Sequence, residues 1–112
     1  MLKIKRVYEP AAADDGKRIL VDRLWPRGQS REAAKVDEWM KEAAPSDELR
    51  KWFNHDPARW QEFRKKYRDE LGAKSELINQ LKTESRRGIV TLLFAARDAE
   101  RNNAVILKEF LG

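Results

Sequence analysis

The segment Ile89–Ala96 has apolar side chains for both faces of a strand. A strand with one face in water alternates apolar and polar residues, whereas a strand of a parallel sheet covered on both faces is almost continuously apolar. The polar pair Arg97-Asp98 follows directly and ends the run. The segment therefore predicts a central strand with helices on each side, which places the chain in the α/β class.

Two earlier segments are predicted to be strands of the same sheet. Lys3–Tyr8 carries apolar residues with partial alternation, and Arg18–Asp22 contains the run Ile19-Leu20-Val21. Between them, Pro10–Gly16 is a stretch of small residues with Asp14-Asp15-Gly16 at its tip, typical of a hairpin or a loop. We expect a small single-domain layered fold over residues 1–112, with a short, mostly parallel sheet flanked by helices.

Helix signals concentrate after residue 44. Ser46 follows a proline and precedes Asp47-Glu48, so it is predicted to cap a helix that ends near Asn54-His55. Asp56-Pro57 starts the next helix, with the aspartate as N-cap and the proline at the first helical position. That helix ends at Gly72, predicted as the C′ glycine. Its inward stripe repeats at helical spacing and is interpreted as core: Trp60, Phe63, Tyr67 and Leu71.

Three further segments complete the prediction. A helix over Glu76–Glu84 is expected to be capped by Ser75, and a final helix spans Asn103–Leu111. Ser30–Ala44 is ambiguous, because its apolar residues fit helical spacing and strand alternation almost equally well. We favour helix for this segment.

Composition limits the class of protein. The chain has 112 residues and no cysteine, so it is long enough for one domain and cannot form disulfides or thiolate metal sites. No apolar run reaches the roughly 20 residues that span a bilayer, and the N-terminus lacks the apolar core of a signal peptide. These features lead us to expect a soluble cytoplasmic protein without membrane contact.

The net charge of +5, from 24 basic and 19 acidic residues, favours anionic partners. It is weak support for nucleic acid, because the basic excess is small and spread along the chain. The sequence contains no phosphate-binding loop, dinucleotide fingerprint or zinc-ligand spacing. We therefore expect no cofactor and no metal site.

The seven residues Asp22–Gly28 form the strongest candidate for a site. They follow a predicted strand, and they include Arg23 and Arg27 on a loop that Pro26 stiffens. Arginine forks at such a place can hold a phosphate or carboxylate through parallel N–H bonds. An alternative interpretation makes both arginines structural ion-pair partners. If the strands before this loop and before Arg97-Asp98 are parallel, the two loops share one crevice.

The helix starting at Ser46 adds three candidates. Ser46 is interpreted mainly as a helix cap, because a nucleophilic serine needs an adjacent base. Arg50 lies one turn into the helix and can reach an anion or form a surface ion pair with Asp47 or Asp56. His55 is the only histidine and the only candidate general acid or base, although it can equally be a turn residue.

Several of these stretches together resemble the YeaO-like branch of domain-of-unknown-function family 488. The match includes Val21 to Gly28, which reads Val-Asp-Arg-Leu-Trp-Pro-Arg-Gly. It also covers Ile4–Tyr8, Asp15-Gly16, Arg18 to Leu20, Trp39, Ala44-Pro45-Ser46, Leu49 to Pro57, Phe63, Tyr67, Glu70-Leu71 and Thr91-Leu92-Leu93. The resemblance implies a compact bacterial or archaeal cytoplasmic α/β domain and carries no established activity with it.

Two departures from that family pattern bear on chemistry. Similar proteins usually carry tyrosine where this chain has Phe94, and their last helix often begins Asn-His-Ala where this chain has Asn102-Asn103-Ala104. This chain lacks both groups, which favours binding over acid–base catalysis and leaves His55 as the sole imidazole.

The leading hypothesis is a binding site for a small anion or small molecule at the strand ends. Its predicted residues are Arg6, Tyr8, Asp22, Arg23, Trp25, Arg27, Ser46 and Arg50, with His55 as the catalytic residue of an enzymatic version. Whether the protein is an enzyme stays open. The alternatives are a nucleic-acid-binding or regulatory module, whose affinity would fall steeply with salt, and an interaction protein with an aromatic docking surface.

Overall fold

The computed structural model describes residues Met1 to Gly112. Its single sheet has four parallel strands in the order β1-β4-β2-β3. The strands are β1 (Leu2–Arg6), β2 (Lys17–Leu20), β3 (Glu38–Trp39) and β4 (Val90–Phe94). Every residue of β4 is buried, and this strand pairs with β1 on one side and β2 on the other. The predicted central strand and parallel α/β sheet are confirmed.

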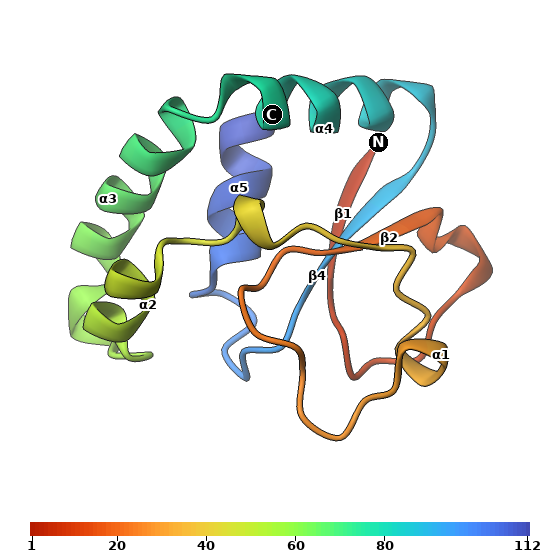
Figure 1. Ribbon diagram of the computed structural model, residues 1–112, viewed down its shortest axis with the longest axis horizontal. Coiled ribbons are helices and arrows are strands. Elements are labelled where there is room, and N and C mark those ends of the chain that lie inside the picture. The colour runs from red at the N-terminus through yellow and green to blue at the C-terminus, as the bar shows by residue number, and fades with distance from the viewer.

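Five α-helices and three short 3₁₀ turns connect the strands (Figure 1). The helices are α1 (Arg31–Ala34), α2 (Asp47–Phe53), α3 (Trp60–Gly72), α4 (Ser75–Arg87) and α5 (Asn103–Leu111). The 3₁₀ turns are η1 (Ala13–Asp15), η2 (Lys41–Ala43) and η3 (Pro57–Arg59). None of the helices has both the length and the apolar character that crossing a membrane requires.

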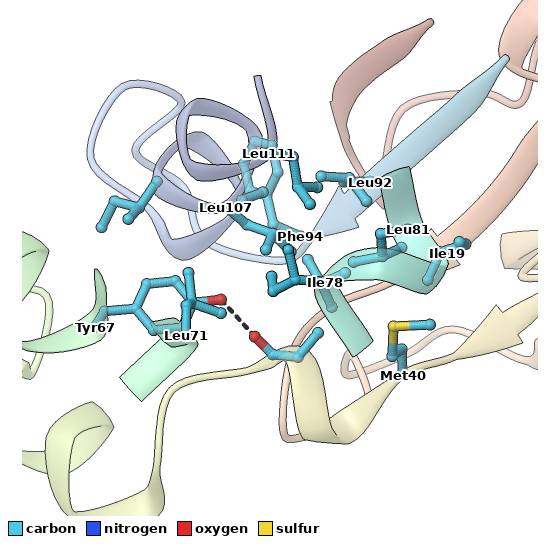
Figure 2. Packing of buried hydrophobic residues seen from close by; sticks show 14 of the residues in the cluster. Ile19, Met40, Tyr67, Leu71, Ile78, Leu81, Leu92, Phe94, Leu107 and Leu111 are labelled. Atoms are coloured by element: carbon cyan, nitrogen blue, oxygen red, sulfur yellow. Dashed lines mark hydrogen bonds between the residues drawn. The ribbon is translucent and has the colours of Figure 1, made fainter. Parts of the chain in front are cut away.

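The main core lies between one face of the sheet and helices α2 to α5. Leu92 and Phe94 of β4 pack there with residues of α3, α4 and α5 (Figure 2). Tyr67 of the predicted inward stripe is fully buried, and its hydroxyl donates a hydrogen bond to the Ala43 carbonyl of η2. Burial and this bond together attach α3 to the segment that follows β3.

The opposite face of the sheet has a smaller cover. Leu20 and Leu93 pack there against Val7 and against Ala34 of α1, in a cluster separate from the main core. Trp25 and Trp39 close its edge, with ring centroids 5.3 Å apart in an edge-to-face arrangement. Loops and the short helix α1 thus cover this face of the sheet, and the long helices all lie on the other face.

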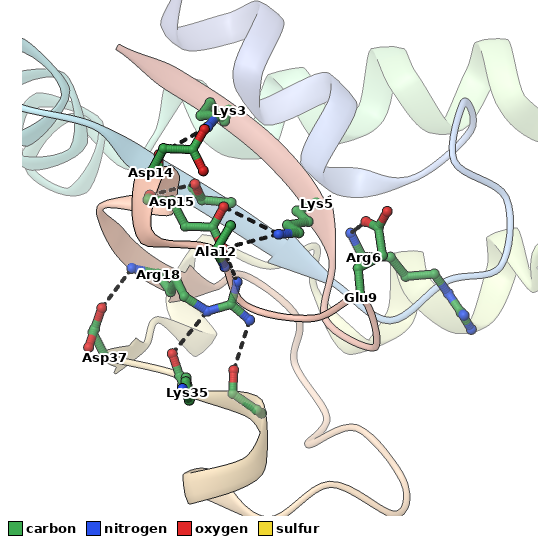
Figure 3. A network of polar contacts seen from close by, with 12 residues as sticks. Lys3, Lys5, Arg6, Glu9, Ala12, Asp14, Asp15, Arg18, Lys35 and Asp37 are labelled. Carbon is green, nitrogen blue, oxygen red and sulfur yellow. Dashed lines mark hydrogen bonds and ion pairs between the residues drawn. The ribbon is translucent and has the colours of Figure 1, made fainter.

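A buried ion pair fastens this second cover to the sheet (Figure 3). Arg18 of β2, 4% exposed, donates to the Asp15 carboxylate at 2.6 Å and to the carbonyls of Ala34 and Lys35. The hydrogen bond from the Ala12 N–H has the largest effect on the pKa of Asp15, and hydrogen bonds from the Lys5 and Arg18 side chains add to it. Against the opposing effect of burial, these bonds lower the pKa to about 2. The network therefore joins η1, β2 and α1 through one guanidinium.

The favoured helix over Ser30–Ala44 is wrong. Helix α1 ends at once because Lys35 adopts a left-handed conformation, with φ of 49°. The chain then forms β3, and the residues that flank it donate backbone N–H groups to carbonyls of β2, Asp37 to Arg18 and Met40 to Leu20. The exposed edge of β2 offers these carbonyls, so pairing with a distant strand overrides the local helical spacing.

Of the hairpin and the loop predicted for Pro10–Gly16, the structure has the loop, because β1 and β2 are parallel and β4 lies between them. Two smaller predictions need correction. Gly72 is the last residue of α3 and not a C′ glycine, since the chain passes into α4 through only Ala73 and Lys74. Ser75 is the first residue of α4, whose N-cap is Lys74.

Candidate functional site

The loops after β1, β2 and β4 meet the C-terminal part of α2 around a cleft of about 1000 Å³. Parallel strands bring these loops to one edge of the sheet, where ligands of open α/β sheets usually bind. The cleft is lined by the predicted residues Arg6, Tyr8, Asp22, Arg23, Trp25, Arg27, Arg50 and His55, together with further residues from the β4–α5 loop. Ser46 is the predicted residue that the cleft does not include.

The Asp22–Gly28 loop is held by bonds to its backbone. The Trp39 indole N–H donates to the Asp22 carbonyl at 2.8 Å, and the Trp25 indole N–H donates to Gln29 at 2.6 Å. The Tyr8 hydroxyl donates to the Arg27 carbonyl at 3.0 Å. Gly28 then leaves the loop with φ of 73°. The backbone at Arg27 is thus anchored, while its side chain is exposed.

The arginines of the cleft fall into two groups. Arg50 pairs with Asp47 at 2.7 Å and Arg101 pairs with Asp98 at 3.4 Å, so each has its own carboxylate. The other group makes no ion pair at all: Arg6, Arg23, Arg27 and Arg97. None of these four guanidinium groups has a carboxylate within ion-pair distance.

Two of the unpaired arginines are positioned through Nε. Arg6 donates Nε–H to the Ala96 carbonyl at 3.1 Å and lies over the Tyr8 ring, 4.6 Å from its centroid. Arg23 donates Nε–H to the Pro45 carbonyl at 3.0 Å. These bonds use only Nε. The terminal nitrogens of both guanidinium groups make no hydrogen bond within the protein, so they are available for a bidentate contact with an oxyanion.

Asp22 is the half-buried carboxylate of the cleft. Its Oδ2 accepts the Ala95 N–H at 2.8 Å, and the Asn103 amide lies beside it and donates to the Val21 carbonyl at 2.8 Å. Burial raises the pKa of Asp22, an effect that the Ala95 N–H, Asn103 and the charge of His55 partly oppose. No ion pair joins Asp22 to an arginine, so its carboxylate is positioned by the backbone.

Ser46 serves the fold. Its Oγ accepts the Leu49 N–H at 3.2 Å, which confirms the predicted helix cap, and it donates to Glu70 at 2.6 Å. The backbone N–H of Ser46 also donates to Glu70, at 2.8 Å. With these bonds made, Ser46 joins α2 to α3 and lies in a separate surface pocket with Trp52.

His55 reaches the rim of the cleft through an unusual backbone. Asn54 and His55 both have left-handed conformations, with φ of 46° and 54°. The imidazole is exposed, makes no hydrogen bond and lies 6.2 Å from the Phe53 ring, centroid to centroid. Its only positioning therefore comes from the turn that ends α2.

A family model described as "Inactive DUF488-N3 subclade" matches residues 1–112. The chain belongs to the DUF488-N3i family. The uncharacterized protein YeaO of Escherichia coli is 41% identical over 110 residues, which cover 98% of this chain and 96% of YeaO. Uncharacterized proteins of Mycobacterium tuberculosis and Mycobacterium bovis are 40% identical over 110 residues, covering 98% of this chain and 92% of each. No solved structure matches. The predicted family resemblance is confirmed.

This DUF488-N3i domain places several residues in the cleft that the predicted site lacked. Arg97 is the most significant, because it is unpaired, and the signal for it was its place directly after the β4 run. Asn103, at the start of α5, and Phe63, from the core stripe of α3, also line the cleft. Asn103 stands where similar proteins often carry histidine, and that departure marks it in the sequence. Nothing local marks Phe63, whose place in the cleft lining depends on how α3 packs.

The DUF488-N3i domain has no cluster of three or more histidine, cysteine, aspartate or glutamate side chains arranged to hold a metal ion. The carboxylates Asp22 and Asp98 both line the cleft, but Asp98 is occupied by the N–H groups of Glu100 and Arg101. The chemistry that the cleft offers is therefore mainly that of arginine side chains.

Asp22→Asn is expected to be at least as stable as the parent protein at pH 7. Because the folded state raises the pKa of Asp22, its ionised form weakens the fold: the contribution to stability is full below pH about 4 and is lost as pH rises through the folded pKa. Asparagine keeps an acceptor for Ala95 and removes the charge. Urea unfolding from pH 3 to pH 8 measures the difference, which should disappear at the acid end.

Asp98→Asn is the matched control with the opposite sign. The N–H groups of Glu100 and Arg101 lower the pKa of Asp98, so this carboxylate stabilises the fold above pH about 4 and loses that effect as pH falls. Asp98→Asn should therefore be the less stable protein at pH 7. If both variants change stability in the same direction, the burial of Asp22 is not what governs it.

Proposed function

We propose that this protein binds a small anionic molecule, through a phosphate or a carboxylate, in the cleft at the strand ends. The observation that carries the proposal is that Arg6, Arg23, Arg27 and Arg97 line one cleft and none of them has a carboxylate partner. Arg18, which holds the fold together, has by contrast a carboxylate partner in Asp15. Like charges around one cleft repel, and a bound oxyanion would relieve that repulsion.

The proposal is for binding and not for catalysis. The matching family is described as an inactive subclade. A general acid or base is normally held by a second group, yet the His55 imidazole is exposed and has no hydrogen-bond partner. The remaining polar side chains of the cleft are suited to recognition, because guanidinium groups do not lose their protons at physiological pH.

Arg27→Ala tests the proposal most directly, because the Arg27 side chain is exposed and unpaired while its backbone is anchored by Tyr8. Without added anion, its free energy of unfolding should stay within about 1 kcal/mol of the parent value. Phosphate at a hundredfold excess over Kd should stabilise the parent by about 2.7 kcal/mol. The variant should lose at least tenfold in phosphate affinity, roughly 1.4 kcal/mol. Thermal unfolding with phosphate, at constant ionic strength set by chloride, measures both.

Arg86→Ala is the control, because Arg86 is also exposed and unpaired but lies at the end of α4, outside the cleft. It removes the same charge and also reports the general stabilisation that phosphate gives by exclusion from protein surfaces. The proposal is wrong if phosphate stabilises all three proteins equally. Steeply salt-dependent binding of an oligonucleotide, unchanged in Arg27→Ala, would favour the nucleic-acid alternative instead.

A further inference from the structure

The size of the cleft exceeds what an inorganic anion needs. Its volume of about 1000 Å³ lies at the upper end of the range for small-molecule pockets. Phosphate or sulfate would occupy the surroundings of the arginines and leave most of this space to water. A ligand that fills the cleft must therefore have an organic body besides its anionic group.

The cleft also has an aromatic and apolar part. Tyr8 and Leu24 line it with side chains 36% and 58% exposed, and Trp25 is partly exposed, whereas the lining residues Phe53 and Phe63 are already buried in the core. Ala95 and Ala96, which follow β4, line it as well and carry no bulky side chain. Covering such surface with the apolar or planar part of a ligand is favourable, because that surface leaves water.

Asp22 is the side chain that an anion-binding cleft does not need. Its Oδ2 accepts the Ala95 N–H, and the Asn103 amide beside the carboxylate donates to the Val21 carbonyl, which leaves Oδ1 without a hydrogen bond. A carboxylate there repels an incoming anion, and its burial also raises its pKa. Its oxygen lone pairs can be satisfied by a hydrogen-bond donor on the ligand, and the surrounding arginines do not supply one.

We propose that the cleft takes an organic anion that also carries an N–H donor, and that Asp22 accepts a hydrogen bond from this donor. The inference rests on the proposed anion site and adds the second half of the ligand. The arginines attract the anionic group, and Asp22 selects among anions, because a site built to accept a hydrogen bond rejects analogues that lack the donor. Asp22 is thus a specificity-determining residue.

Titration calorimetry with a graded set of aryl phosphates tests this assignment. The probes are inorganic phosphate, phenyl phosphate, and the 3- and 4-aminophenyl phosphates. The two amino compounds add an N–H donor at two different distances from the phosphate group. We expect phenyl phosphate to bind about tenfold more tightly than inorganic phosphate, through the buried aromatic area. The better of the two amino compounds should gain about another tenfold through its hydrogen bond to the carboxylate.

Asp22→Asn should remove the preference for the amino compound and leave phenyl phosphate bound at least as tightly as by the parent. Its amide oxygen can take over the Ala95 N–H, which leaves an NH₂ group where the parent has an acceptor. Asp98→Asn changes the other carboxylate of the cleft, which is paired with Arg101, and should keep the preference.

The results separate the two proposals. If inorganic phosphate binds but phenyl phosphate binds no better, the anion site stands and the organic ligand is wrong. If the amino compounds match phenyl phosphate in the parent, or if Asp22→Asn keeps their advantage, the role of Asp22 is wrong. If none of the phosphates binds, the anion site fails and this inference fails with it.

Discussion

Replacing Arg18 by methionine is expected to lower the free energy of unfolding by about 3–5 kcal/mol, the usual effect of breaking a buried ion pair from one side. Arg18 and Asp15 have side chains only 5% and 4% exposed, with N and O atoms 2.6 Å apart. Methionine keeps much of the apolar stem but leaves the carbonyls of Ala34 and Lys35 without their donor (Figure 3). Urea unfolding at pH 7 measures the loss.

Arg64→Met is the control for this effect. Arg64 pairs with Glu109 on the surface, with side chains 39% and 41% exposed, and such pairs contribute about 0–1 kcal/mol. Acid provides a second readout, because Asp15 stabilises the fold above its unfolded pKa and loses this effect between pH about 4 and about 2. Without Arg18 this acid-dependent loss should be smaller. A cost for Arg18→Met no larger than that for Arg64→Met would show that the network is not what holds α1 to the sheet.

Gly16→Ala is the second change with a large expected effect, a loss of about 3 kcal/mol or more. Gly16 has φ of 63° and ψ of −136°, a backbone conformation open essentially to glycine alone. A Cβ atom there would lie 2.1 Å from the Ile89 carbonyl oxygen. That oxygen accepts the Lys17 N–H at the start of β2. Relief of the clash would therefore disturb the entry to two paired strands, which circular dichroism and urea unfolding can follow.

Two other glycines separate the contributions of conformation and space. Gly28 also has a positive φ, of 73°, but a Cβ there meets no atom within 4 Å, so Gly28→Ala should cost only about 1–2 kcal/mol. Gly72 is helical and equally open, so Gly72→Ala should stabilise the protein by about 0.4–1 kcal/mol. Equal effects at Gly16 and Gly28 would mean that the close approach to Ile89 has no consequence.

Asp22 connects stability to the proposed ligand. A carboxylate whose ionised form weakens the fold and repels anions has no structural reason to be there, since asparagine could accept the Ala95 N–H equally well. Functional sites often carry groups of this kind, because recognition needs a charge where folding does not. The proposals for the cleft therefore predict two effects of Asp22→Asn together. The variant should be at least as stable as the parent at pH 7, and it should lose the preference for ligands with an N–H donor.

Much of the fold follows from rules that act within a few residues. The continuous apolar run of β4 requires a layer on each face of the sheet, because its side chains point alternately to both faces. Ser46 caps α2 and Asp56 caps the 3₁₀ turn η3 that leads into α3, each with a side-chain oxygen that reaches an N–H group two or three residues ahead. The Asp22–Gly28 loop could be recognised as a candidate site, because its charges and its proline lie together in the chain.

Other features were decided by contacts between distant parts of the chain. The segment after Lys35 pairs with β2 because the edge of that strand has unused carbonyls, and only the tertiary structure brings the two together. Arg97 joins the cleft while Ser46 does not, because Glu70 of α3 takes the polar groups of Ser46 and holds them against another helix. Side-chain type and spacing therefore determined which elements form and which residues carry charge. Non-local hydrogen bonds and packing determined which of those charges share one cleft.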